Sequence, residues 1–242
     1  DLSSLLSAIP DGASVFFSDI ENNSTLEISG NKKIFGSLTQ SSASVILSGD
    51  ITLGAEIKLI DSSVTVKSGS VTVESGSITA LGASAFILDR YADAKLIVDS
   101  GKISSDHASG TINQRVGTVF INGGEISSFV SSAVVTASSL YLSGAPVFSS
   151  VSADISTERA IHLSADGKYF SGAVKVKVER EFERGEFYPI LLSANEGQSS
   201  SVKLIDKSGL EKKLTFYSSS KYTEEKDFFA VFDANEAKFF ID

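Results

Sequence analysis

The feature that most constrains this chain is a Ser-Gly or Gly-Gly pair that recurs after the same kind of short apolar segment. In each copy apolar and polar residues alternate, and successive glycines lie 19, 20, 32, 23 and 20 residues apart. Periods of about 20 to 50 residues are typical of solenoids, propellers and other repeat arrays. The copies are residues 26–30, 45–49, 64–69, 96–101, 119–124 and 140–144, with a weaker seventh at 161–164.

A second short strand follows most of the glycines and a third apolar patch follows a loop, so one repeat holds three strands. The 32-residue step holds an extra half-copy, residues 73–78. Alternation places Leu26 and Ile28 on one face, which a single coil cannot bury but stacked coils can. We therefore predict an all-β chain, a right-handed parallel β-helix from residue 24 to about 165, with three strands per coil and about six to seven coils.

Both ends of the chain depart from the repeat. Apolar residues at positions 2, 5, 6 and 9 have helical spacing and stop at Pro10, and a strand follows at 15–17, which predicts an N-terminal cap over residues 1–23. Charge density doubles late in the chain, from 25 charged residues in 1–160 to 26 in 161–242. We expect two regions: 1–165, the β-helix with its cap, and 166–242, an antiparallel β cap or small β domain. Its expected strands are 173–178, 187–192, 202–205, 214–217, 228–232 and 238–241, the last two forming a hairpin across 233–236.

Composition excludes several classes of function. The chain has no Cys, which rules out disulfides, thiolate metal sites and cysteine nucleophiles, and its two His exclude a histidine-rich metal site. A net charge of −9 without a basic stripe argues against nucleic acid as a partner. No apolar run approaches the roughly 18 to 20 residues of a membrane span, so we expect no membrane insertion of this chain. It opens without a leader, and we expect a mature chain whose signal peptide has been removed.

The order of short helix, Asp-Gly, apolar strand and then residues 25–32 (Thr-Leu-Glu-Ile-Ser-Gly-Asn-Lys) resembles the N-terminal cap and first coils of pectin-lyase-like β-helix proteins. Among these it looks most like bacterial surface adhesins and autotransporter passengers. The resemblance covers residues 1–165. The Gly-Gly-x-Ile motif of the polymorphic outer-membrane proteins occurs once, at 123–126, and their Phe-x-x-Asn motif is missing. The resemblance implies a protein that is extracellular or on the bacterial outer surface.

A search for catalytic constellations finds no nucleophile elbow, phosphate loop or metalloprotease helix. The longest polar insertions of the solenoid are instead the candidate ligand site, because inserted loops on one edge of a repeat array often form its binding face. The same residues also read as ordinary solvated loops. No cofactor is expected, although these acids would suit Ca²⁺. The candidate residues are Asp89, Arg90, Tyr91, Asp93, Asp106, His107 and Arg115.

The outward residues of the copies form a second candidate surface. If they stack, they change from charged to apolar along one face, which makes a stripe that either the C-terminal segment or a partner covers. The predicted stripe is Glu27, Ile46, Thr65, Ile97, Phe120 and Tyr141.

Three functions fit these observations. The first is a non-catalytic, adhesin-like β-helix, a monomer that binds an extracellular glycan or a host or surface protein through an extended face and edge loops. The second is a polysaccharide lyase or glycoside hydrolase of the pectin-lyase-like type, which the resemblance implies. A lyase of this type uses acidic residues that hold calcium with an Arg or Lys base, and a hydrolase needs paired carboxylates in a groove. The third is the structural stalk of a larger secreted protein. The sequence leaves enzymatic activity open.

Overall fold

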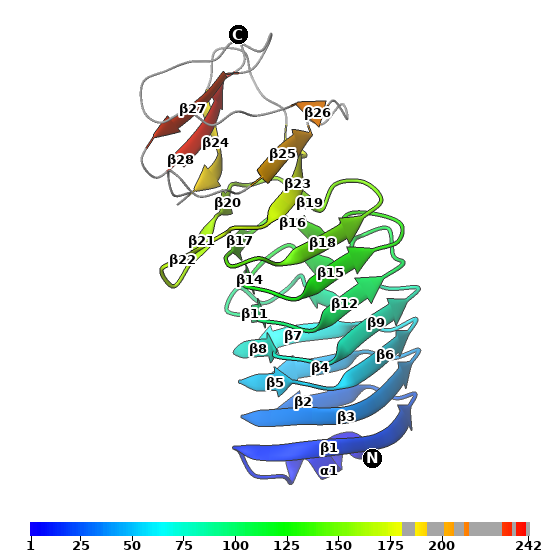
Figure 1. Cartoon of the computed structure of the whole chain (residues 1–242). Coiled ribbons are helices and arrows are strands. Elements are labelled where there is room, and N and C mark those ends of the chain that lie inside the picture. Colours follow the sequence, from blue (N-terminus) through cyan, green and yellow to red (C-terminus); the bar gives the residue numbers. More distant parts are fainter. Residues whose placement is uncertain (181–186, 193–200, 206–210, 213–228, 234–235, 241–242) are drawn as a thin grey trace.

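The computed structural model describes residues 1–180, 187–192, 201–205, 211–212, 229–233 and 236–240. Within them the chain is an all-β parallel solenoid of about eight turns with one short helix, α1 (Leu2–Ser7), and a small antiparallel sheet at the C-terminal end (Figure 1). The predicted parallel β-helix is confirmed, with slightly more turns than the predicted six to seven.

Each turn contributes strands to three faces. Face 1 is the column β2 (Leu26–Ser29), β4 (Val45–Ser48), β7 (Val64–Ser68), β10 (Phe86–Leu88), β13 (Ile112–Gln114), β16 (Val134–Thr136), β19 (Ile155–Thr157), β23 (Ala173–Val178) and β25 (Ser201–Ile205). Face 2 is β5 (Ile51–Leu53), β8 (Ser70–Val73), β11 (Lys95–Val98), β14 (Thr118–Ile121), β17 (Ser139–Leu142) and β20 (Ile161–His162). Face 3 is β6 (Glu56–Ile60), β9 (Ser77–Leu81), β12 (Lys102–Ser105), β15 (Glu125–Ser128) and β18 (Val147–Ser150).

Faces 2 and 3 form one continuous sheet because the first long strands bend across both. β3 (Lys32–Ser41) pairs with β5 through its first residues and with β6 through its last ones. β1 (Ala13–Asn22) lies beside β3 in the same parallel sense. The first coil therefore has two faces made by one strand, and α1 takes the place of a face 1 strand beneath β2.

The repeated Ser-Gly pair changes its place in the coil, which corrects the predicted alignment of the copies. Gly30, Gly49 and Gly69 turn the chain from face 1 to face 2, whereas Gly101 and Gly124 turn it from face 2 to face 3. Val64 consequently pairs with Phe86, and Lys95–Val98 pairs with Ser70–Val73. The predicted extra half-copy at 73–78 contains Gly76, the first of the glycines that turn the chain from face 2 to face 3. The 32-residue step therefore contains no inserted repeat.

The two glycine columns are needed because each corner packs directly on the corner of the coil below. Gly69 has a φ of +70°, and a Cβ there would lie 2.5 Å from the carbonyl oxygen of Gly49. Gly101 has a φ of +85°, and its Cβ would lie 3.0 Å from the carbonyl oxygen of Gly76. Only glycine adopts this backbone conformation without strain and leaves room for the neighbouring coil.

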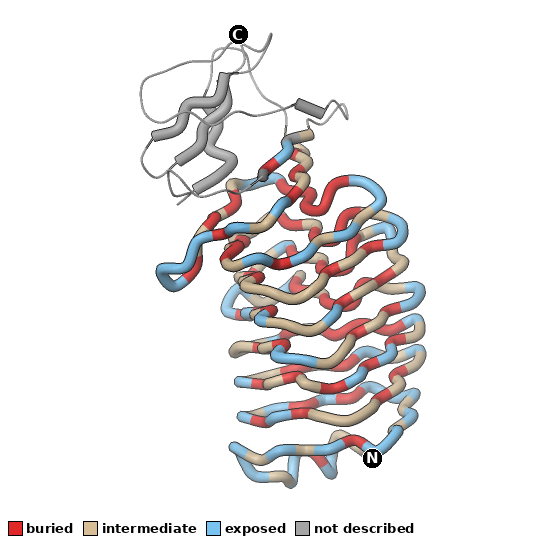
Figure 2. The backbone as a smooth tube through the Cα atoms, in the orientation of Figure 1, coloured by how far each residue is buried: buried red, intermediate tan, exposed pale blue. Residues whose placement is uncertain are grey.

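The core consists of inward-facing Val, Ile and Leu in columns along the solenoid axis, and buried residues alternate with more exposed ones along most strands of the three faces (Figure 2). Polar residues enter the core at the corners, where they bind turn carbonyls. Gln114 donates to the carbonyls of Gly117 (3.0 Å) and Ser139 (2.9 Å) and accepts from the Thr136 hydroxyl. In the described part of the chain every buried side-chain nitrogen and oxygen has a partner, as a stable interior requires.

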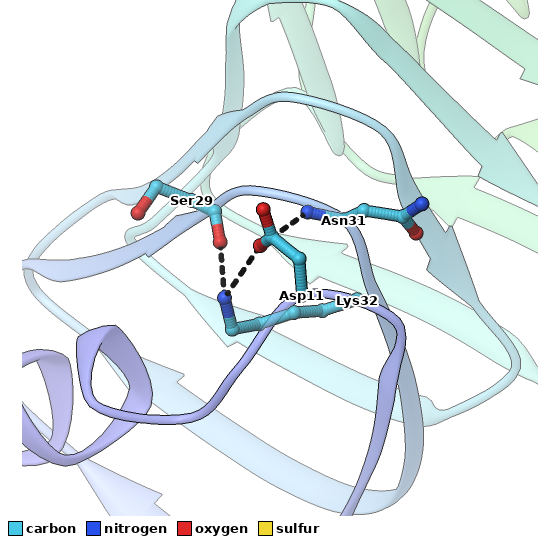
Figure 3. A network of polar contacts seen from close by, with 4 residues as sticks. All are labelled: Asp11, Ser29, Asn31 and Lys32. Atoms are coloured by element: carbon cyan, nitrogen blue, oxygen red, sulfur yellow. Dashed lines mark hydrogen bonds and ion pairs between the residues drawn. The ribbon is translucent and has the colours of Figure 1, made fainter.

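The N-terminal cap is held to the second coil by a buried lysine (Figure 3). The Lys32 side chain is 3% exposed, its Nζ donates to the Ser29 carbonyl (2.6 Å), and Nζ lies 3.6 Å from Asp11 Oδ1. The same Asp11 oxygen accepts from the Asn31 backbone N–H (3.0 Å). The predicted cap helix over 1–9 and strand at 15–17 are both present, as α1 and β1.

Parallel pairing continues past the expected boundary at residue 165. β23 pairs in parallel with β19 and with β25, and β24 (Phe187–Leu192) pairs in parallel with β20. Antiparallel pairing begins with the hairpin β21 (Ser164–Ala165) and β22 (Lys168–Tyr169), and with β26 (Glu211–Lys212) against β25. The predicted hairpin across 233–236 is confirmed as β27 (Phe229–Asp233) and β28 (Glu236–Phe240), and β28 also pairs with β24. The strand predicted at 214–217 lies outside the described residues.

Candidate functional site

A groove of about 390 Å³ runs along the outside of face 1 across β13, β16, β19 and β23. Its floor is the row of outward residues that stand opposite one another in register, Asn113, Val135, Ser156 and Lys177. Three of these four can donate or accept hydrogen bonds. The groove therefore follows the solenoid axis and offers one floor position per coil.

The groove exists because the loops that enter face 1 are longer in these coils. The loop before β7 has three residues (61–63), whereas the loop before β13 has six (106–111) and the loop before β16 has five (129–133). These longer loops rise beside the strands and supply one wall, which contains Ala108, Ser109, Ser131, Ser132 and Ser152.

The opposite rim is a column of residues directly after the face 1 strands. The backbone ladder continues one residue beyond each strand, since the N–H groups of Glu158 and Glu179 donate to the carbonyls of Thr136 (3.2 Å) and Thr157 (2.8 Å). Arg115 and Ala137 occupy the same position in the two coils before. This rim thus changes from Arg115 at one end of the groove to two glutamates on neighbouring coils at the other.

Floor and rim are tied together at the acidic end. Glu179 Oε1 accepts from the Ser156 hydroxyl (2.7 Å) and lies 2.9 Å from Lys177 Nζ. Glu158 is exposed on the neighbouring coil and lines the same groove. One carboxylate is therefore fixed by two side chains of the floor, and the other faces the open groove.

The seven residues predicted as a ligand site separate onto the two edges of face 1. Asp106 and His107 lie in the loop before β13, where Asp106 Oδ1 accepts from the Gly82 N–H (2.7 Å) and His107 Nδ1 accepts from the Ser109 N–H (3.3 Å). These contacts fix the loops of two neighbouring coils. The pair therefore supports the base of the groove wall, and the sequence-based prediction of its role in ligand binding stays a prediction.

The other five predicted residues lie at the opposite edge. Asp89, Arg90, Tyr91 and Asp93 follow β10, and Arg115 follows β13 one coil further on. Asp89 and Arg90 form an ion pair at 3.7 Å, and Tyr91 packs partly buried against the core. Arg115 alone of the seven lines the groove.

The predicted outward stripe is divided between two faces. Glu27, Ile46 and Thr65 stand in one row on face 1, because the early copies lie there. Ile97, Phe120 and Tyr141 stand in a row on face 2 and continue to His162. Ile97, Phe120 and Tyr141 of the predicted stripe therefore lie in one row, and Glu27, Ile46 and Thr65 belong to a different surface.

The face 2 row is an aromatic stack along the axis. The rings of Phe120 and Tyr141 lie 4.8 Å apart at 18°, and those of Tyr141 and His162 lie 4.2 Å apart at 12°. Desolvation by burial lowers the pKa of His162 from its ordinary value of 6.5. Because the faces of Tyr141 are covered by its neighbours, this ring cannot serve as a platform for a sugar.

Sequence reasoning missed the groove residues Ser156, Lys177, Glu158 and Glu179. The sequence-based prediction concentrated on the most polar insertions. The groove is instead formed by one outward residue of each face 1 strand, such as Ser156, and by the residue two positions later, such as Glu158. Aligning the coils on the third apolar patch of each repeat, rather than on Ser-Gly, brings these positions into columns.

Within the described ranges no three His, Asp or Glu side chains gather closely enough to hold a metal ion. The helical part of those ranges contains no segment long and apolar enough to cross a membrane. Comparison of the chain with protein-family models, with curated proteins and with solved structures finds no match.

Proposed function

We propose that this protein is a non-catalytic, adhesin-like binding module that works outside the cell and holds a glycan chain along the groove of face 1. The observation that carries the proposal is the continuous groove across four coils, with a floor of mixed polar side chains and two distinct walls. Binding sites are concave surfaces with a few placed polar groups, and this groove has that character.

The geometry favours an extended polymer. Neighbouring strands of a parallel sheet lie about 4.8 Å apart, so equivalent floor residues recur at that interval along the axis. A pyranose unit advances a glycan by a comparable length, which allows one sugar to face each coil. Hydroxyl groups of such a chain would meet the Asn113 amide, the Ser156 hydroxyl and the Lys177 ammonium in turn.

A groove-filling substitution tests the proposal. Asn113→Trp places a large ring on the groove floor, and Ser104→Trp places the same ring on the outward side of β12, on face 3 of the preceding turn. Both host positions are partly exposed, so both variants should fold. We expect the intact chain to bind members of a panel of soluble polysaccharides in calorimetry, Asn113→Trp to lose that binding, and Ser104→Trp to keep it. Equal binding by the two variants would contradict the proposal, as would failure of the intact chain to bind any glycan.

A glycoside hydrolase is the second candidate, and a specific observation favours it. Glu158 and Glu179 occupy equivalent positions on neighbouring coils in the groove. Retaining enzymes use two carboxyl groups about 5 Å apart, which is close to the spacing of neighbouring coils. In such a mechanism Glu179, held by Ser156 and Lys177, would be the nucleophile and Glu158 the acid and base.

The two candidates separate in one experiment. The panel polysaccharides are incubated with the intact chain, Glu158→Gln and Glu179→Gln, and released reducing ends are measured. The binding proposal predicts no release of reducing ends by any of the three, and binding of the polysaccharide by the intact chain. Release by the intact chain that both substitutions abolish would establish the hydrolase instead.

A further inference from the structure

Face 3 ends earlier than the other two faces of the solenoid. β18 is the last strand of the face 3 column, whereas face 1 continues with β19, β23 and β25, and face 2 continues with β20 and β24 (Figure 1). In the part of the chain that the structure describes, one edge of β18 pairs with β15 and no strand pairs with the other edge. The sheet of face 3 therefore has an open edge before the solenoid itself ends.

The edge is open because the following turn crosses face 3 without forming a strand there. Phe170 lies on Gly144 as an isolated bridge, and the Ser171 N–H donates to the Gly144 carbonyl (2.7 Å). In the turn below, residues 145–154 form β18 and a corner before face 1 begins again at β19. After Phe170 only residues 171–172 precede β23, which already belongs to face 1. This turn therefore lacks the residues that would cover β18.

The core beneath the open edge is incompletely covered. Phe148 continues the inward column of Ile103 and Ile126, which are fully buried, but Phe148 itself is only half-buried. On the outward side of the same segment, Val147 and Val151 are 59% and 71% exposed. One more strand would remove apolar surface from water on both sides of the sheet, which is favourable.

The backbone of β18 offers hydrogen bonds to such a strand. The Val147 N–H donates to the Gly124 carbonyl of the preceding coil (2.9 Å). Because successive residues of a strand direct their backbone groups to opposite edges, the N–H and C=O groups of Phe148 and Ser150 point to the open edge. Within the described ranges none of these four groups has a hydrogen-bond partner. An exposed edge of this kind binds an extended peptide by strand addition.

A cavity of about 370 Å³ lies at this edge, between β18 and the first residues of β23, and Lys175 and Lys203 line it in register. Lys175 Nζ donates to the Ser152 carbonyl (3.1 Å), so this ammonium group lies at the C-terminal end of β18. The carboxylate in the described lining is Asp154, which is 5% exposed. It accepts from the Ser150 hydroxyl (2.7 Å) and the Lys175 backbone N–H (2.8 Å). The accessible charge at this end is therefore positive and suits an acidic group.

From this edge we infer a second binding site, which takes an extended peptide segment of a partner protein as the missing strand of face 3. The segment runs parallel to β18, with an apolar residue inward over Phe148, a small residue inward over Ser150, and an acidic residue beyond Val151 near Lys175. Because β23 and β25 also line the cavity, it admits a single segment and not the end of a second solenoid. The inference does not rest on the proposed function, since no residue lining this cavity lines the groove.

The probe is the peptide acetyl-Gly-Val-Ile-Thr-Ala-Val-Asp-Gly-amide, in which Ile, Ala and Asp take the three places named above. Two further versions carry an N-methyl group on one backbone amide, at Thr or at Ile. Thr would lie opposite Ser149 and donate to the Phe148 carbonyl, whereas the Ile N–H would point away from β18. In calorimetry we expect the Thr methyl to lower the affinity about tenfold and the Ile methyl to leave it nearly unchanged. Equal effects of the two methyl groups, or a larger effect at Ile, would overturn the inference.

A charge exchange tests the acidic end of the peptide. We expect Lys175→Glu to weaken the probe about threefold, and to bind a version with Lys in place of Asp about threefold better than the intact chain does. Lys58→Glu is the matched control, because Lys58 is exposed on β6 of the same face but both edges of that strand are paired, and it should do neither. Thermal unfolding first establishes that both variants fold.

Three outcomes would overturn the site. The first is no binding of the probe by the intact chain at about 1 mM, where even a weak peptide site would be occupied. The second is failure of the Lys version to bind Lys175→Glu better than it binds the intact chain. The third is a dimer of the intact chain, seen by sedimentation, that the probe dissociates, because this would assign the edge to a second copy of the chain.

Discussion

The lower coils, β2 to β9, and the upper coils, β10 to β23, share one kind of core but differ at their corners. On face 1 Val45 and Val64 stand opposite one another 19 residues apart, whereas Phe86 and Ile112 do so 26 residues apart. Leu59 in the lower coils and Leu96 in the upper coils are equally buried. The added residues of the upper coils therefore go into the corners, and the corners that flank face 1 become the walls of the groove. The buried core columns therefore determine the solenoid fold, and the lengths of the corner loops determine the shape of its outer surface.

The largest effects should come from the shared core and should be the same in both halves. Leu59→Ala and Leu96→Ala each remove a fully buried side chain, and we expect each to lower the free energy of unfolding by about 2 to 5 kcal/mol. Urea titration followed by circular dichroism measures both. A difference well above the usual scatter between the two variants would show that the halves do not share one kind of core.

The glycine corners should give the next largest effects, and here the halves should differ. Gly69→Ala and Gly101→Ala both strain a positive φ, at a cost of about 1 to 3 kcal/mol. The contact at Gly69 is tighter (2.5 Å against 3.0 Å), so this lower-coil variant should unfold at the lower urea concentration. Gly167→Ala is the control, because its φ is +74° but a Cβ there meets nothing within 4 Å. A larger loss at Gly101 than at Gly69 would contradict the expected order.

Changes to the loops should affect binding more than stability. Deleting Ala108 and Ser109 shortens the upper-coil loop 106–111 and lowers one groove wall, and we expect glycan affinity to fall about tenfold, or about 1.4 kcal/mol. Inserting Ala-Ser into the lower-coil loop 61–63 is the matched control and should leave affinity unchanged. Calorimetric titration measures the affinity of both. Unaltered binding by the deletion variant would show that the length of this loop does not contribute to glycan binding.

The smallest effect should come from His162 at the upper end of the aromatic stack. Its pKa is lowered by burial, so the unfolded chain takes up the proton first as the pH falls. The contribution of neutral His162 to stability is therefore complete above about pH 6.5 and declines as the pH falls toward the lowered pKa. Thermal unfolding of the intact chain and of His162→Tyr between pH 7.5 and about 5 measures it, and the variant should lack this part of the decline. An identical pH dependence in both chains would exclude His162 as its source.

The sequence was sufficient for the solenoid because alternation and the recurring Ser-Gly corner are local properties of the chain. The cap helix, the strand at 15–17 and the hairpin across 233–236 were predictable for the same reason. The register was not, since Ser-Gly marks one corner up to Gly69 and another corner from Gly76 onward, and each corner needs glycine for the same steric reason. Because Ser-Gly occurs at both corners, the sequence pattern does not distinguish the corner between faces 1 and 2 from the corner between faces 2 and 3.

The same ambiguity explains why most residues of the candidate site could not be predicted from the sequence. Arg115 was a candidate because it follows a recognisable third strand, and its role in binding stays a prediction. Glu158 and Glu179 follow strands that the Ser-Gly alignment did not place in the same column. The loop pairs Asp89–Arg90 and Asp106–His107 are polar in sequence, yet which edge of a face they occupy depends on the path of the coil. Only the stacking of coils brings Ser156 of one coil beside Glu179 of the next.

The contact between Lys32 and Asp11 has a mechanical consequence. Backbone hydrogen bonds between coils run along the solenoid axis, so a tensile load applied along that axis at the first residues would open the coils one at a time instead of shearing many bonds together. The first resistance to such a load comes from the cap, where Ser3 Oγ donates to the Thr25 carbonyl (3.2 Å) and accepts from the Glu27 N–H (3.0 Å), and then from the contacts of Asp11 with Lys32 and Asn31. The yield force of the molecule, pulled from this end, would then depend on the contacts of the cap and of β1 with β3, and not on the number of coils behind them.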